Sequence, residues 1–142
     1  VTVAQKNDAG GAGSVGTASD YARFLQMMIN GGQLDGVRLL SPTTVRYMTA
    51  DHLAPDFKAS GVTTLPVGTG FGLGFAVRRE TGRFEVTGNA GEYFWAGAAG
   101  TGFYVDPKED LICVWMTQGQ PGMPRRYDRY LFKQMVYQAI SD

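Results

Sequence analysis

Few side chains in this 142-residue chain are candidates for nucleophilic or acid–base chemistry. Ser14 lies in the run Ala12-Gly-Ser-Val-Gly16. This run differs from the Gly-x-Ser-x-Gly pattern of a nucleophile elbow at one position, where Ala12 replaces the first glycine. That turn requires a strand before the serine, and an acid and then a histidine downstream. No clear strand precedes Ser14, and the one histidine, His52, follows it too closely for an α/β-hydrolase. We therefore interpret the run as a loop.

The same loop also contains the pattern Gly-x-Gly-x-x-Gly, at Gly11, Gly13 and Gly16. A dinucleotide site needs a firm strand before this pattern and a second parallel strand after the helix, carrying an acid for the ribose. Residues 1–3 make only a weak strand, and Asp35 lies in a predicted turn. A glycine-rich loop before a capped helix explains the pattern better, and no cofactor is predicted.

The other reactive groups are isolated. His52 follows a predicted helix, where a lone imidazole is expected on the surface or as a cap rather than as a base. Cys113 is the single cysteine and lies in an apolar run, which predicts a buried inert thiol and excludes an internal disulfide. No metal-ligand spacing or phosphate-binding loop occurs, so no metal site is predicted. The pairs 78–79 and 125–126, all arginine, are expected to be solvated at the ends of elements.

The stretch 91–107 combines several glycines, which have no side chain, with large aromatic residues. Gly97, Gly100 and Gly102 interrupt an apolar segment, and glycine within a strand marks a bulge or a close approach to the backbone. Large aromatic residues surround these glycines: Tyr93, Phe94, Trp95, Phe103 and Tyr104. The residues alone leave two interpretations open, a bulged and twisted sheet strand or a slot for a substrate.

Composition limits the possible partners. The chain is 44% hydrophobic and 18% charged with a formal net charge of zero, as in ordinary soluble domains. This balance gives no electrostatic reason to expect nucleic acid or an anionic membrane as a partner. No apolar run approaches the roughly 18 residues that span a bilayer. The first residue is Val1 rather than Met, as expected of a processed product or a piece of a longer chain.

The first half of the chain predicts two helices. Thr17 is a candidate N-cap with Asp20 in the capping-box position, and an apolar face follows at helical spacing up to Gly31-Gly32. Ser41-Pro42 begins a second helix, and residues 52–70 are predicted to be loop.

The second half predicts four strands and a helix. Residues 71–77 alternate large and small side chains, so one face of this strand is bare and requires a closely packed neighbour. Residues 83–87 are predicted as the return strand, and 111–117 as a strand covered on both faces. A last helix at about 125–140 is expected to bury one apolar stripe: Phe132, Met135, Val136, Ala139 and Ile140. The short connections predict an antiparallel sheet flanked by helices, an α+β fold that is incomplete without further protein.

Three runs of sequence resemble a known enzyme family. Residues 18–25, Ala-Ser-Asp-Tyr-Ala-Arg-Phe-Leu, and 30–42, Asn-Gly-Gly-Gln-Leu-Asp-Gly-Val-Arg-Leu-Leu-Ser-Pro, resemble the C-terminal part of β-lactamase-superfamily serine hydrolases. Residues 95–111 resemble the strand of that superfamily's third motif and its return. The similarity is greatest to class C-like enzymes and family VIII carboxylesterases. It implies that residues 1–70 lead out of the all-helical subdomain and that 71–142 supply strands and the C-terminal helix of the α/β subdomain.

The resemblance also implies roles for particular residues. The superfamily uses a Ser-x-x-Lys nucleophile, a tyrosine base in the class C-like branch, and a Lys-Thr-Gly third motif. This chain contains neither of the first two, and its third motif is Trp95-Ala96-Gly97. The resemblance makes the backbone N–H of Ala98 an oxyanion donor and adds neighbouring substrate-binding residues: Tyr93, Phe94, Trp95, Ala96 and Gly97.

The implied activity is that of a carboxylesterase. Tryptophan cannot supply the cation that a β-lactamase or D,D-peptidase uses to hold a substrate carboxylate, so small neutral esters are the expected substrates. The nucleophile and base must come from an N-terminal segment, and the chain alone is expected to be inactive. The alternatives are a non-catalytic binding or scaffold domain and a D,D-peptidase or weak β-lactamase. The resemblance points to a bacterial protein, with a cytoplasmic or an exported location left open.

Overall fold

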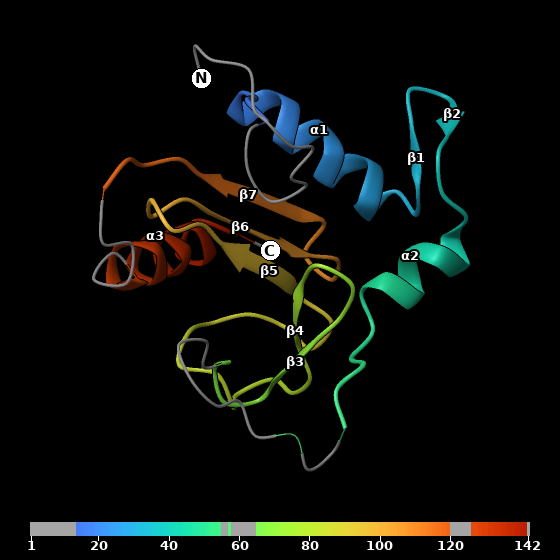
Figure 1. The fold of residues 1–142 in the computed structure, drawn as a ribbon. Helices are drawn as coiled ribbons and strands as arrows, with labels where there is room; N and C mark the ends of the chain where they lie inside the picture. Colours follow the sequence, from blue (N-terminus) through green and yellow to red (C-terminus); the bar gives the residue numbers. More distant parts are fainter. Residues whose placement is uncertain (1–13, 55–56, 58–64, 120–125, 142) are drawn as a thin grey trace, which may run out of the picture.

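The computed structural model describes residues 14–54, 57, 65–119 and 126–141, and its centre is an antiparallel sheet of five strands with helices on both faces (Figure 1). The strands follow chain order across the sheet: β3 (Thr69–Phe71), β4 (Ala76–Arg78), β5 (Tyr93–Ala96), β6 (Gly102–Asp106) and β7 (Leu111–Trp115). Sequential pairing through short connections confirms the predicted α+β class with an antiparallel sheet. Several residues discussed above lie outside the described ranges: 1–3, Gly11, Gly13 and Arg125. Of Arg126, only the backbone is described.

Helix α1 (Ala18–Ile29) begins as its sequence predicts. The Thr17 hydroxyl accepts the Asp20 N–H at 3.1 Å, and the Asp20 carboxylate accepts the Thr17 N–H at 2.9 Å, which completes a capping box. After the helix, Gly31 and Gly32 adopt φ of 67° and 93°, and the Gly32 N–H donates to the Met27 carbonyl at 2.8 Å. A Cβ at Gly32 would collide with the Leu40 backbone, so glycine is needed there for both conformation and space.

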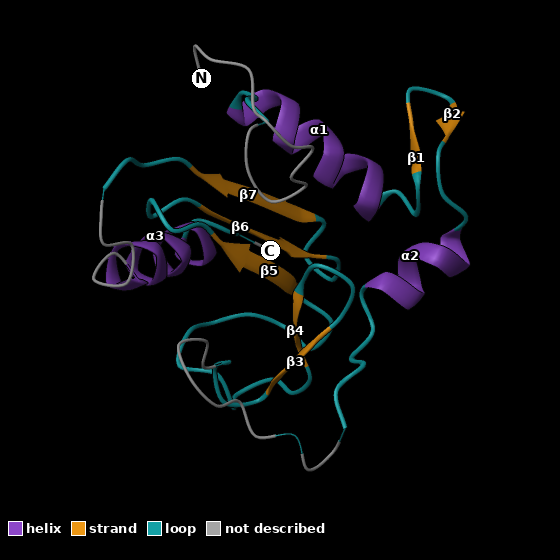
Figure 2. Cartoon of the chain, in the orientation of Figure 1, coloured by secondary structure: helices purple, strands orange, loops and turns teal. Residues whose placement is uncertain are grey.

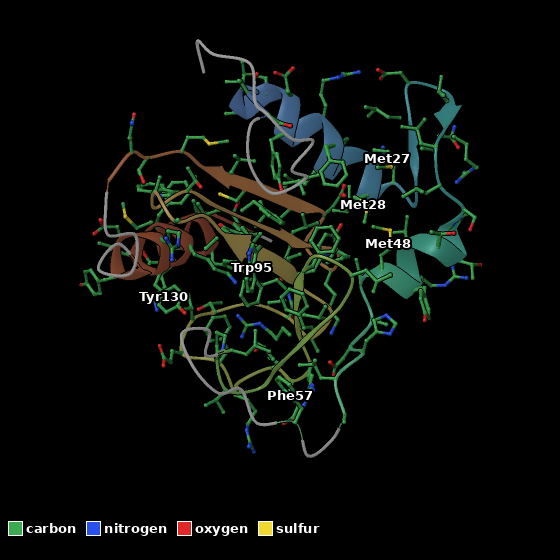
Figure 3. The ribbon with its side chains drawn as sticks, in the orientation of Figure 1. Met27, Met28, Met48, Phe57, Trp95 and Tyr130 are labelled. Carbon is green, nitrogen blue, oxygen red and sulfur yellow. The ribbon has the colours of Figure 1, made fainter. Side chains whose placement is uncertain are left out.

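A small hairpin and a short helix follow. Strands β1 (Gln33–Leu34) and β2 (Val37–Arg38) flank the predicted turn, and α2 (Pro42–Met48) starts after Ser41, whose hydroxyl accepts the Thr44 N–H at 3.0 Å. Figure 3 shows Met27, Met28 and Met48 gathered where α1 approaches α2. Together with Val45 and the inner face of the sheet, these side chains form the main apolar core.

Two strand predictions were wrong. Residues 71–77 are a hairpin rather than one strand, since the Gly72 N–H donates to the Phe75 carbonyl at 2.7 Å and Gly74 turns the chain at φ 92°. Residues 83–87 form no strand and belong to the long loops visible in Figure 2. In this loop the backbone carbonyls of Val86 and Thr87 accept hydrogen bonds from the Arg78 guanidinium, at 2.9 and 3.4 Å, and not from a neighbouring strand.

The two faces of the sheet differ in chemistry. On one face Phe103 packs against Tyr21 of α1, with ring centroids 5.2 Å apart. On the other face Tyr104 stacks on Tyr137 of α3 (Arg126–Gln138) at 6.2 Å. Since alternate residues of β6 point to opposite faces, α1 and α3 cover opposite sides of the sheet.

The predicted apolar stripe of the last helix was only partly correct, because Phe132 and Val136 are half-buried, with the Phe132 ring 4.7 Å from that of Trp115, and the other three residues are exposed. Met135 and Ile140 are exposed, and the side buried against the sheet also carries Lys133, 5% exposed. The ion pair of Lys133 and the ring contacts of Phe132 and Tyr137 therefore together fix which side of α3 faces inward. None of the helices within the described ranges is long and apolar enough to cross a bilayer.

Candidate functional site

The predicted site residues make up β5 and the first part of the turn after it. Trp95 and Ala96 pair with Phe103 and Gly102 of β6, and the chain then reverses. The Gly97 N–H donates to the Thr101 carbonyl at 2.9 Å, and the Gly100 N–H donates to the Gly97 carbonyl at 3.0 Å. The glycines of this stretch thus form a tight hairpin, so the structure has a strand, a turn and a return strand here.

Ala98 stands at the tip of this hairpin. Ala98 is exposed, and its backbone N–H donates to no backbone acceptor within the described ranges. The hydrogen bonds of the turn are made by its neighbours on either side. This amide is therefore outside the ladder and available to donate to a bound group.

The structure separates the other predicted residues. Trp95, Ala96 and Ala98 are exposed, whereas Tyr93 is 2% exposed and packs edge-on against Phe75 at 5.2 Å. Phe94 lies on the opposite side of β5, stacked on Phe84 at 5.5 Å. Burial raises the pKa of the Tyr93 phenol, whose oxygen has no hydrogen-bond partner among the described residues. The accessible part of the site is therefore the segment from Trp95 to Ala98.

Trp95 has an aromatic neighbour that the sequence did not indicate as a site residue. The ring of Phe71 lies 4.9 Å from the indole at an interplanar angle of 83°, an edge-to-face contact. The indole remains 37% exposed. The only signal in the sequence was the large–small alternation that begins at Phe71, which gives no information about Trp95.

Of the bare positions that the alternation predicted, Gly72 has a close neighbour, as has Gly70 just before Phe71, whereas Gly74 has open space around it. A Cβ at Gly70 would collide with the Asp51 carboxylate, and a Cβ at Gly72 would collide with the Met48 carbonyl oxygen. The segment after α2 therefore lies directly against β3, which brings Asp51 to within hydrogen-bond distance of the Phe71 N–H.

A buried ionic cluster lies between the sheet and α3. Arg78, expected to be solvated, is 1% exposed, and its Nε donates to Glu92 at 3.0 Å. Lys133 forms an ion pair with the other oxygen of the Glu92 carboxylate. The prediction that Arg78 is solvated was wrong because its charge is compensated by Glu92, 14 positions later in the sequence. Glu92 directly precedes β5, so this cluster anchors the start of that strand.

A second acid, Asp106, completes the polar layer. The Tyr137 hydroxyl donates to its carboxylate at 2.5 Å, and both the backbone and the side-chain N–H of Asn89 donate at 3.1 and 3.0 Å. Burial alone would raise the pKa of Asp106, but these hydrogen bonds hold it below the ordinary value. Asp106 and Glu92 thus attach α3 to β5 and β6.

The remaining candidates of the sequence show no catalytic arrangement. His52 is exposed, and its Nε2 lies 2.7 Å from the Tyr47 carbonyl, a cap at the end of α2. Cys113 is half-buried, and burial raises the pKa of its thiol. Ser14 is an exposed loop residue. Across the described part of the chain, no three His, Cys, Asp or Glu side chains are grouped to hold a metal ion.

Comparisons with known proteins agree with this architecture. The chain is 38% identical over 118 residues to Protein Rv1367c of Mycobacterium tuberculosis (strain ATCC 25618 / H37Rv), an alignment covering 80% of this chain and 29% of that protein. The chain thus spans less than a third of the length of the curated relatives it matches.

Solved structures show the same fold. EstCE1, described as a hydrolase with promiscuous acyltransferase activity, is 28% identical with a TM-score of 0.76, over 95% of this chain and 33% of its own. Simvastatin synthase (LovD) from Aspergillus terreus is 21% identical with a TM-score of 0.65, over 86% of this chain and 34% of its own. A penicillin-binding protein homolog from Caulobacter crescentus is 24% identical with a TM-score of 0.61, over 84% and 30%. The family model described as Beta-lactamase matches residues 1–135, so this chain, with its mixed α/β fold, belongs to that family.

Proposed function

We propose that this chain is the C-terminal portion of a serine carboxylesterase that hydrolyses small neutral esters through an acyl-enzyme. A preceding segment would supply a Ser-x-x-Lys nucleophile and a tyrosine base. The serine oxygen would attack the ester carbonyl, the alcohol would leave, and water would then release the acid. The likeness to EstCE1, a hydrolase, and the short span of this chain relative to its relatives support this proposal.

The observation that carries the proposal is the exposed Ala98 amide, three residues after Trp95. A tetrahedral intermediate places negative charge on the former carbonyl oxygen, and preorganised N–H donors stabilise it. A hairpin tip held by its own flanking hydrogen bonds presents such a donor with little reorganisation. Loss of one donor of this kind costs about 3–4 kcal/mol of barrier.

Trp95 favours neutral over anionic substrates. The position offers an apolar ring and one N–H donor instead of an ammonium group. A carboxylate placed beside this ring would lose hydration without gaining an ion pair. An ester with an uncharged acyl group avoids this cost.

The first test compares two forms of the protein. The chain alone and a form extended upstream to the length of its relatives are treated with a fluorophosphonate serine probe, p-nitrophenyl butyrate and nitrocefin. We expect the extended form to be labelled and to turn over the butyrate ester faster than nitrocefin, and the chain alone to do neither. Full activity of the chain alone would refute the proposal. An unlabelled extended form would favour a non-catalytic binding domain, and faster nitrocefin turnover a D,D-peptidase or weak β-lactamase.

A second test addresses Ala98 directly. Ala98→Pro removes the backbone N–H, and Ala98→Ser keeps it. We expect the proline variant of the extended form to lose about 100- to 1,000-fold in kcat, and the serine variant to stay within a few fold. Equal activity of the two variants would exclude Ala98 as an oxyanion donor.

A further inference from the structure

Phe71 is the last residue of β3, and its backbone is anchored from both sides. Its N–H donates to Asp51 Oδ1 at 3.0 Å, and its carbonyl accepts the His52 N–H at 2.9 Å. The Asp51 carboxylate is itself held, because it accepts the Leu53 N–H at 3.1 Å and forms an ion pair with Arg79. The position of Phe71 is therefore set by the segment after α2 as well as by the sheet.

The neighbouring glycines permit this anchor. A side chain at Gly70 would displace the Asp51 carboxylate, and one at Gly72 would displace the backbone of Met48. Partial burial alone would raise the pKa of Asp51, but the hydrogen bonds from Arg79 and from the two backbone N–H groups keep it below the ordinary value. Asp51 is thus a carboxylate at neutral pH, the form that accepts these bonds.

The anchored ring meets Trp95. The two rings are 4.9 Å apart at 83°, and the indole keeps 37% of its surface exposed. The exposed Ala96 and Ala98 follow on the same segment and add only methyl groups. The exposed side chains between Trp95 and Ala98 are therefore one indole, contacted on one side by Phe71, and two methyl groups, while the Thr101 hydroxyl lies beside Gly97.

We propose that Phe71 is a positioning residue that holds the indole of Trp95 as a wall beside the Ala98 amide, and that this wall selects esters carrying an aromatic group. The proposal rests on the proposed esterase function. A flat aromatic group gains a stacking or edge contact with the fixed indole, which a short alkyl group does not make. An indole that could rotate freely would lose this preference, because fixing its rotamer when the ester binds would cost conformational entropy.

The kinetic test uses the extended form of the protein and two aromatic substrates. Ethyl phenylacetate carries the ring in the acyl part and phenyl acetate in the alcohol part, and each is compared with ethyl acetate by pH-stat. For Phe71→Leu we expect the kcat/KM preference for one of the two aromatic esters to fall about two- to tenfold, the range of one aromatic pair. Phe71→Tyr should keep the preference, since its ring is retained.

The matched control is Phe84→Leu, which removes a buried ring that stacks on Phe94 at 5.5 Å, on the far side of β5. It should lower stability without changing either preference. An unchanged preference in Phe71→Leu for both aromatic esters, or an equal fall in Phe84→Leu, would overturn the assignment.

A second readout does not depend on activity. The 142-residue chain contains two tryptophans, so labelling with 5-fluorotryptophan produces two ¹⁹F resonances, from Trp95 and Trp115. We expect Phe71→Leu to move the Trp95 resonance alone, and Phe132→Leu to move that of Trp115, whose ring lies 4.7 Å from Phe132. A Trp95 resonance that does not move in Phe71→Leu would refute the positioning role. If no form hydrolyses esters but this resonance moves, the esterase proposal fails while the positioning role stands.

Discussion

Replacing Glu92 by glutamine tests whether the ionic cluster under β5 holds α3 to the sheet. The Glu92 carboxylate pairs with Arg78 at 3.0 Å and with Lys133, and the three side chains are 1%, 1% and 6% exposed. Burial raises the pKa of Glu92, partly offset by Lys133 and Arg78, and burial likewise lowers the pKa of Lys133. The desolvation of all three groups is therefore compensated only while they remain together.

The expected cost follows from which charges are left unpaired. Glu92→Gln leaves two buried cations next to each other without their shared acid, and breaking a buried pair in this way costs about 3–5 kcal/mol. Lys133→Met leaves Glu92 paired with Arg78, and the thioether fills an aromatic environment. We expect it to cost about 1–3 kcal/mol, because no buried ion loses its last partner. The order of the two variants is the sharper prediction.

The assay is urea unfolding followed by circular dichroism at neutral pH, with Glu80→Gln as control. Glu80 and Arg83 form an ion pair of 3.9 Å with both side chains more than 60% exposed. Removal of such a surface pair is expected to cost less than about 1 kcal/mol. A cost of Lys133→Met equal to or above that of Glu92→Gln, or a cost of Glu92→Gln no larger than that of the control, would refute the reasoning.

Three further variants, the last with a matched control, test the local structure. Asp106→Asn should destabilise the chain by about 1–3 kcal/mol at neutral pH. Because the folded pKa of Asp106 lies below the ordinary 3.8, this difference should be fully present above that value and should shrink as the pH falls through the folded pKa, as measured by urea unfolding at several pH values. Thr17→Ala removes the N-cap of α1 and should cost about 1 kcal/mol in the same assay. Gly70→Ala should cost about 1–3 kcal/mol in thermal unfolding, because its methyl group would collide with Asp51, whereas Gly16→Ala, with open space around it, should cost almost nothing.

Local sequence was sufficient for the elements whose signals lie within a few residues. The capping box of α1 spans Thr17 to Asp20, and the start of α2 depends on Ser41 and the proline after it. The glycine pair that ends α1 and the antiparallel order of the strands also follow from short-range rules. The family could be inferred from the runs at residues 18–25, 30–42 and 95–111, whereas the division of the chain at residue 70 stays a prediction.

Tertiary structure alone decided the rest. Arg78 became a buried residue because it meets Glu92 at a separation of 14 positions, and Lys133 turned inward on α3 because it meets the same acid at 41. Phe71 reached Trp95 only because a hairpin replaced the predicted straight strand and the segment after α2 anchored it. Caps and turns depend on neighbours in the chain, so composition and spacing reveal them. Compensation of a buried charge or packing of a ring depends on partners that only the folded chain brings together.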